Sequence, residues 1–224
     1  MPEPFPEAQA KGAVYIVLAA LCWSTLGPVS KLAFAHGVAP LDVAFWRAVS
    51  GWALFAGQAA WLGQTRVRPR DLPGLAVFGF LGVSVFYGAY QIAVRDGGAA
   101  LASVLLYTAP AWVALLARFF LGEGLTRIKI ICILLSMAGV AGVAFGSGET
   151  QGRGGWPLLG VACGLVSGLT YASYYIFSKR FLRTYRAPTI FLYIQPFGAL
   201  FLLPFLGGLP ADAVAWASVL FLGL

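Results

Sequence analysis

The chain has 224 residues, of which 60% are hydrophobic and only 10% are charged. A soluble domain carries about 25% charged residues, so this composition excludes a water-soluble fold and indicates a membrane protein. The net charge of +7 would favour nucleic-acid binding only if the basic residues gathered on one binding surface.

Long runs without a charged residue divide the chain into segments that are predicted to cross the bilayer as helices. Seven complete runs are near or above the ~18–20 residues that a spanning helix needs, and an eighth reaches the last residue. We therefore expect an all-α polytopic membrane protein with seven complete helices and the start of an eighth. The runs are 12–30, 48–65, 72–94, 97–117, 130–148, 154–178, 187–211 and 213–224.

The basic residues are divided unequally between the two sides of this predicted bundle. The loops on the side of the N-terminus carry 11 Lys and Arg residues, and the loops on the other side carry four. Cytoplasmic loops are the ones enriched in Lys and Arg, so we expect a bacterial inner-membrane protein with a cytoplasmic N-terminus. The charge is thereby explained as a topology signal, and no nucleic-acid partner is expected.

Cysteine and histidine are too few and too scattered for a metal or redox site. Cys22, Cys132 and Cys163 lie singly in three different runs, and the only histidine, His36, is predicted to be solvated in a short loop. No metal and no cofactor are therefore expected. A membrane-embedded enzyme, which would need a cluster of His, Asp and Glu, is kept as an alternative.

The second half of the chain repeats part of the first at a constant offset of 148 residues. Ser30-Lys31 aligns with Ser178-Lys179, and Ala39-Pro40 aligns with Ala187-Pro188, without a gap. Because five predicted spans separate the copies, the second copy enters the membrane from the opposite side. Inverted repeats are a recurrent plan of secondary transporters, which bind substrate between the copies near the midplane. We expect repeats at 12–145 and 158–224, joined by a polar, glycine-rich linker at 146–157.

Two stretches resemble a known family. They are the W-S followed by S-K in the first run, and the segment LLYTAPAWVALLARFFLGEGLTRIKIICILLSMAGVAGV, with its proline, its L-G-E and its glycine-rich end. Both are similar to the EamA type of the drug/metabolite transporter superfamily. The resemblance implies ten helices in two inverted five-helix repeats. A second L-G-E would fall roughly 148 residues after Glu123, beyond Leu224, so the second repeat is expected to be incomplete in this chain.

A proline in the first run predicts where an unpaired backbone carbonyl lies inside the membrane. Pro28 has no N–H, so the Ser24 carbonyl loses its helical partner and must be satisfied otherwise or line a wet cavity. Trp23 lies 11 residues after Gly12, or about 16 Å of helix rise, which is near the middle of the bilayer. Trp23 and Ser24 are therefore predicted to bind substrate, and Lys31 lies near the outer end.

Other runs place polar and aromatic side chains at a similar depth. They recur at spacings of three and four residues, which put them on one face of a helix, and polar faces in membranes point toward protein or water. Ordinary helix packing is the alternative for the tyrosines. The predicted substrate-binding residues of these runs are Tyr87, Tyr90, Gln91, Tyr107, Tyr171 and Tyr174, and Arg47 joins Lys31 as a charge at the outer mouth.

The function expected from these observations is secondary transport of a small metabolite or drug-like solute, by alternating access and in the direction of export. Amino acids and aromatic compounds are the solute classes considered. The expected partners are this solute and the lipid bilayer, and a homodimer is left open. A non-transporting or truncated membrane protein is the main alternative, ahead of the embedded enzyme.

Overall fold

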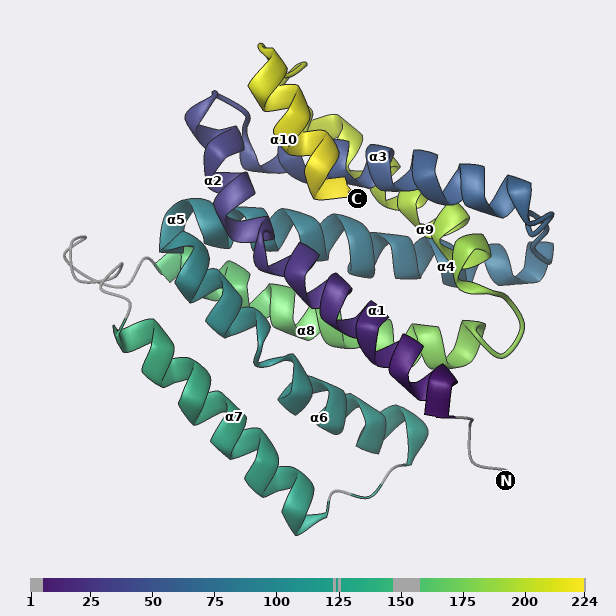
Figure 1. Cartoon of the computed structure of the whole chain (residues 1–224), viewed down its shortest axis with the longest axis vertical. Helices are drawn as coiled ribbons and strands as arrows, with labels where there is room; N and C mark the ends of the chain where they lie inside the picture. The colour runs from purple at the N-terminus through teal and green to yellow at the C-terminus, as the bar shows by residue number, and fades with distance from the viewer. Residues whose placement is uncertain (1–5, 123, 125, 147–157, 224) are drawn as a thin grey trace.

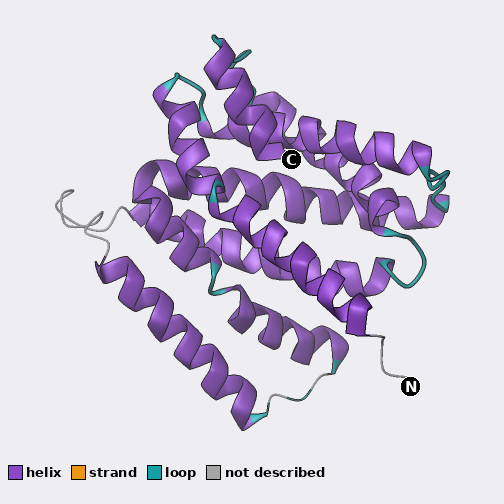
Figure 2. Cartoon of the chain, viewed as in Figure 1, coloured by secondary structure: helices purple, strands orange, loops and turns teal. Residues whose placement is uncertain are grey.

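A computed structural model describes residues 6–122, 124, 126–146 and 158–223 (Figure 1). Every regular element among these residues is a helix (Figure 2), as the composition predicts. Four segments of this described part are long and apolar enough to cross a membrane: Gly12–Ala35, Pro69–Leu106, Leu158–Phe181 and Ala187–Phe205. The predicted linker lies, apart from Gly146, outside the described residues, as does Glu123.

The first predicted run is broken into two helices. Helix α1 (Pro6–Ser24) ends just before Thr25, and α2 (Leu26–Ala35) follows. The break lies where Pro28 leaves a carbonyl without its helical donor, so the predicted irregularity is confirmed. In Figure 1, α1 runs diagonally across the bundle, and its side chains from residue 12 to residue 24 are exposed.

Helix α3 (Pro40–Trp61) begins eight residues before the uncharged run that predicted it. Pro40 stands in its first turn, where a missing N–H costs nothing, and Asp42 adds a negative charge that the N-terminal end of a helix dipole favours. The uncharged run therefore identified only the apolar part of this helix. Arg47 lies in the helix but was left outside the predicted span.

Residues 69–106 form one nearly continuous helical stretch, composed of η1 (Pro69–Asp71), α4 (Leu72–Gly79), the π-helical η2 (Phe80–Val85) and α5 (Phe86–Leu106). The third and fourth predicted runs meet in it, at a kink where Gly98 has φ 84° and ψ 162°. Two residues separate α5 from α6 (Ala109–Leu121). Pro110, which frees the Leu106 carbonyl, accounts for this second break.

The remaining helices are α7 (Arg127–Gly146), α8 (Leu158–Phe181), α9 (Ala187–Leu202) with the short η3 (Leu203–Phe205), and α10 (Ala213–Gly223). The bundle is centred on α5, which packs along α8, and on α3, which packs along α9. Gly160, Gly164 and Gly168 of α8 lie against α5 and Thr108, where an added Cβ would come within 3.0 Å of the neighbouring atoms. These glycines let the two helices approach closely.

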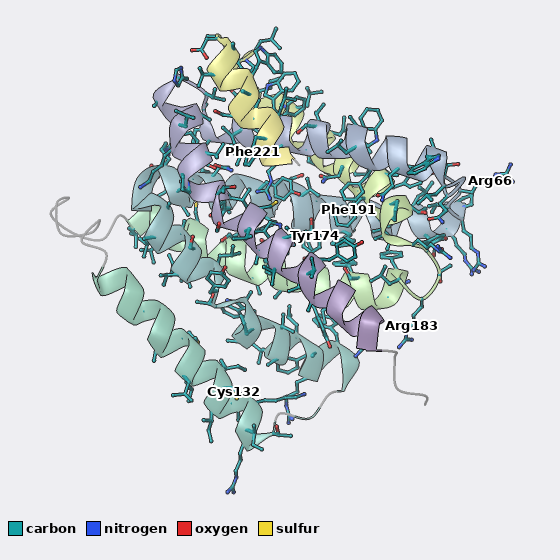
Figure 3. All side chains as sticks on the ribbon, in the orientation of Figure 1. Arg66, Cys132, Tyr174, Arg183, Phe191 and Phe221 are labelled. Atoms are coloured by element: carbon teal, nitrogen blue, oxygen red, sulfur yellow. The ribbon has the colours of Figure 1, made fainter. Side chains whose placement is uncertain are left out.

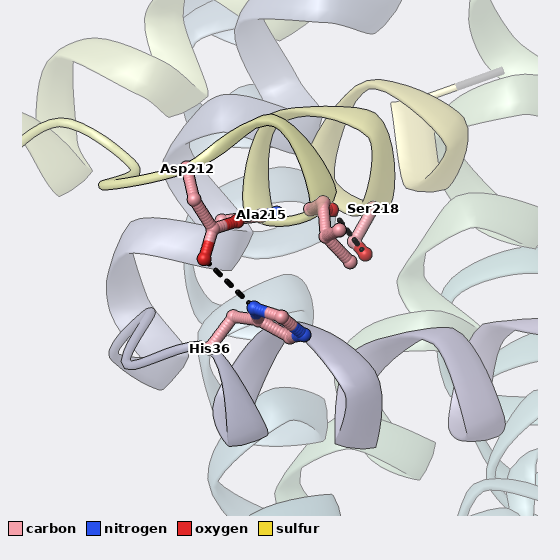
Figure 4. A network of polar contacts seen from close by, with 5 residues as sticks. His36, Asp212, Ala215 and Ser218 are labelled. Carbon is pink, nitrogen blue, oxygen red and sulfur yellow. Dashed lines mark hydrogen bonds and ion pairs between the residues drawn. The ribbon is translucent and has the colours of Figure 1, made fainter.

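Two sets of polar contacts join the loops at opposite ends of the bundle. In the first, which we call the His36 link, His36 Nδ1 lies 2.8 Å from Asp212 Oδ2 (Figure 4). In the same link, the Gly207 N–H donates to Asp42 Oδ1 at 2.8 Å. Sequence reasoning had left His36 solvated, because it could not place Asp212 beside it.

In the second set, which we call the Tyr185 link, the Tyr185 hydroxyl donates to Asp71 Oδ2 at 2.5 Å and accepts from the Arg68 N–H at 3.1 Å. The Thr189 hydroxyl donates to the Gln64 carbonyl at 2.7 Å. This link ties the α3–α4 loop to the α8–α9 loop, and Arg66 and Arg183 of those loops lie at the same edge of the bundle (Figure 3).

The His36 link is expected to weaken in acid. The Ala215 N–H, and then His36, hold the pKa of Asp212 below its ordinary value. A lowered pKa means that this contribution to stability is complete above the ordinary carboxylate range, near about pH 4, and is lost as the pH falls through the lower value. An Asp212→Asn variant should melt no more than about 3 °C lower at pH 7. The difference should vanish in acid, and a difference independent of pH would contradict the link.

Candidate functional site

The side chain of Tyr87 is the point where three other helices meet α5. It is 7% exposed. The Arg47 guanidinium of α3 lies over its ring, 4.2 Å from the centroid, and the Gln195 amide of α9 donates to its hydroxyl at 3.5 Å. Tyr174 of α8 lies within interaction distance of the same hydroxyl. A cation, a phenol and an amide thus converge inside the bundle.

Aromatic rings form one wall of this cluster. The Tyr171 and Tyr174 ring centroids are 6.0 Å apart, and Phe86 lies 5.2 Å from Tyr171. Phe191 of α9 stacks near Tyr174 at 6.4 Å, in the middle of the bundle in Figure 3. Faces of this kind stack on planar or apolar groups of a small molecule.

A cavity of about 480 Å³ opens beside these tyrosines. Tyr171 and Tyr174 belong both to its lining and to the cluster, and the other lining residues are Val113 of α6, Tyr175, Ser178, Lys179 and Leu182. Small-molecule sites have volumes of about 300–1,000 Å³. The cavity therefore has the size and lining of a pocket for a small solute.

Two buried amides near the cluster carry atoms without a hydrogen-bond partner among the described residues. Gln91 is 0% exposed, and neither its side-chain nitrogen nor its oxygen is paired. Gln195 uses its nitrogen on Tyr87, and its Oε1 is unpaired. An unpaired buried polar group costs about 1–3 kcal/mol, so these atoms are sites where a ligand or water would be stabilised.

The structure brings together most of the residues predicted to bind substrate. Arg47, Tyr87, Tyr171 and Tyr174 form the cluster through the contacts above. Tyr90 follows Tyr87 by three residues in α5 and is close enough to Arg47 to interact with its charge. Gln91 follows Tyr87 by one helical turn and shares its face.

Four predicted residues lie outside the cluster. Trp23 is 59% exposed on α1, and the Ser24 hydroxyl donates to the Leu21 carbonyl within the same helix. Lys31 is exposed on α2. Tyr107 is 60% exposed, although its hydroxyl is within electrostatic reach of Tyr90 and Tyr171. Helix rise and helical spacing place these side chains along their helices, but they do not say which neighbour a side chain faces.

Arg47 was predicted to share the outer mouth with Lys31, and the structure shows its guanidinium over the ring of Tyr87. It stands seven residues after Pro40, about 10 Å into its helix. Gln195 was missed as a site residue. Its signal was present in the sequence, since the offset of 148 pairs Gln195 with Arg47.

The model of the EamA-like transporter family matches residues 10–145, which is more than half of the chain. The chain belongs to the EamA-like transporter family. This EamA-like chain is 32% identical over 220 residues to a probable terminal-alkyne amino-acid exporter of Streptantibioticus cattleyicolor, a match that covers 93% of this chain and 70% of that one. It is also 28% identical to the uncharacterized transporter YdfC of Bacillus subtilis over 160 residues.

The chain spans 51% of the length of YdfC and 56% of an uncharacterized Archaeoglobus fulgidus transporter to which it is 29% identical. A solved crystal structure of an unspecified protein has the same fold, with a TM-score of 0.64 at 20% identity over 91% of this EamA-like chain and 70% of the other. Family membership and the apolar helices make this chain a membrane protein of a transporter family.

Proposed function

We propose that this chain exports a small solute across the plasma membrane by alternating access, with the Tyr87 cluster as its binding site and its N-terminus in the cytoplasm. The observation that carries the proposal is the meeting of Arg47 and Gln195 on Tyr87. Transporters with inverted repeats bind substrate where the repeats meet, and these two residues occupy equivalent positions of the two proposed copies.

The arrangement of the end links supports two inverted copies, 12–145 and 158–224. Subtracting 148 from Asp212 gives Gln64, and adding 148 to His36 gives Thr184. The His36 link therefore has a counterpart in the Tyr185 link, at the other end of the bundle. Arg66 and Arg183 lie beside the Tyr185 link, which favours the cytoplasm for that end.

The solute classes that fit the cluster are amino acids and aromatic compounds. Rings of Tyr171, Tyr174 and Phe86 offer apolar faces, and Arg47, Gln91 and Gln195 offer polar atoms. The relative named as a probable amino-acid exporter supports the first class. A zwitterion with an apolar side chain would use both kinds of surface.

Efflux from liposomes tests the proposal. The 224-residue chain would be reconstituted in liposomes that are loaded with single radiolabelled L-amino acids, from aliphatic to aromatic. Efflux of at least one of them should exceed that of protein-free liposomes, and an excess of the same unlabelled amino acid should compete with it. The same slow leak from both kinds of liposome for every amino acid and for labelled aromatic acids would contradict the proposed function.

A further inference from the structure

Arg47 is a cation inside the bundle for which the described residues supply no ion-pair partner. Its guanidinium lies over the face of Tyr87, and the ion pairs of that part of the chain, His36–Asp212 and Arg95–Asp96, do not include it. The nearest acid along α3, Asp42, accepts the Gly207 N–H. A charged side chain within a membrane is costly unless it is paired or faces a wet cavity.

The guanidinium has hydrogen-bonding capacity that the ring does not use. It carries five N–H donors in a planar fork, and a cation over a ring face interacts through its charge, which leaves the edge of the fork available. Arg47 is only half-buried, so part of its side chain is accessible. Two parallel N–H donors match the two oxygens of a carboxylate.

The neighbouring amides add complementary groups. Gln195 Oε1 is a buried acceptor without a donor, and Gln91 has both an acceptor and a donor unpaired. Both side chains are at least nine-tenths buried. A molecule that brings an anion to Arg47 and an N–H to an amide oxygen would satisfy groups that the described protein leaves unsatisfied.

We propose that Arg47 anchors the carboxylate of the transported solute and thereby makes the transporter selective for carboxylate-bearing molecules over their neutral amides. This inference rests on the proposed function, because it takes the Tyr87 cluster as the transport site. Arg47 then has two roles at once: its face is held by Tyr87, and its edge binds the solute.

A purely structural arginine would behave differently. If Arg47 only packed on Tyr87, its replacement would lower the stability of the protein and would weaken the binding of all solutes by one common factor. A carboxylate anchor changes the ratio between the affinities for a carboxylate and for its amide. This ratio is insensitive to a general loss of packing.

The experiment measures that ratio on the purified chain in detergent by thermal shift. The probes are L-phenylalanine, L-leucine and their α-amides, because each amide keeps the shape and loses the negative charge. In the wild type we expect each carboxylate to bind at least tenfold more tightly than its amide. In Arg47→Gln the ratio should fall to about one, and Arg47→Lys, which keeps the charge without the fork, should give an intermediate value.

Arg183→Gln, in the exposed loop that follows α8, is the matched control and should leave the ratio unchanged. Equal affinities for acid and amide in the wild type, or a ratio that survives in Arg47→Gln, would overturn the anchor. The absence of a shift with any of the four probes would overturn it too. If any of these three results were found while the liposomes still released another solute, the proposed transport function would stand without the anchor. If selective binding were found without efflux, only the transport function would be overturned.

Discussion

Replacing Tyr87 with alanine is expected to reduce solute efflux at least about a hundredfold. The ring lies under the Arg47 guanidinium, and the hydroxyl accepts a hydrogen bond from the Gln195 amide. Losing a desolvated cation–π contact costs about 2 kcal/mol, and leaving a buried amide unpaired costs about 1–3 kcal/mol more. Both residues would also lose the side chain that positions them for the solute.

Tyr87→Phe separates these two contributions, because it keeps the ring and removes the hydroxyl. Efflux should fall only about tenfold in this variant, since the weak 3.5 Å hydrogen bond to Gln195 is the part that is lost. Tyr15→Ala, at a side chain that is 71% exposed on α1, is the control and should transport normally. Initial efflux rates, normalised to folded protein, measure all three. Normal transport by a folded Tyr87→Ala protein would remove Tyr87 from the site.

Gly198→Leu is expected to prevent stable folding. An added Cβ at Gly198 would lie 2.4 Å from Val83 Cβ and 3.0 Å from the Gly79 carbonyl oxygen. Overpacking of this kind costs about 1–3 kcal/mol or more, and the short Val83 side chain on one side and the Gly79 backbone on the other leave little room for relaxation. The close crossing of α9 over α4 and η2 therefore depends on this glycine.

The control is Gly139→Leu in α7, where an added Cβ meets nothing within 4 Å. Thermal unfolding in detergent should show a melting temperature close to the wild type for this control. For Gly198→Leu it should show a much lower melting temperature or an aggregated protein. Equal stability of the two variants would mean that α9 and η2 do not cross where the structure places them.

Composition and uncharged runs predicted helices and their order, and Pro28 predicted the break in the first of them. These features follow from local chemistry, because an apolar run must be helical in lipid and a proline removes one hydrogen bond. The start of α3 was missed because the prediction used uncharged runs alone. A rule that excludes charge from a span cannot include Arg47, whose charge is accommodated by a ring 40 positions away in the sequence.

The site was predictable only in part. Helical spacing predicted that Tyr87 and Gln91 share a face, and that Tyr171 and Tyr174 do. Spacing gives no information about which helix lies opposite, so Trp23 was predicted on the same grounds although it lies exposed on α1. Gln195 could have been found from its repeat partner Arg47, because equivalent residues of inverted copies approach the same axis.

The central claim, that two inverted copies open alternately around the Tyr87 cluster, is tested most directly by two distances in one experiment. Spin labels would be placed at Ala39 and Ala211 beside the His36 link, or at Arg66 and Arg183 beside the Tyr185 link, after replacement of Cys22, Cys132 and Cys163. Double electron–electron resonance in nanodiscs would then compare samples with and without an exported amino acid. Addition of the solute should shift the two distance distributions in opposite directions. Distances that stay fixed, or that lengthen together, would contradict alternating access.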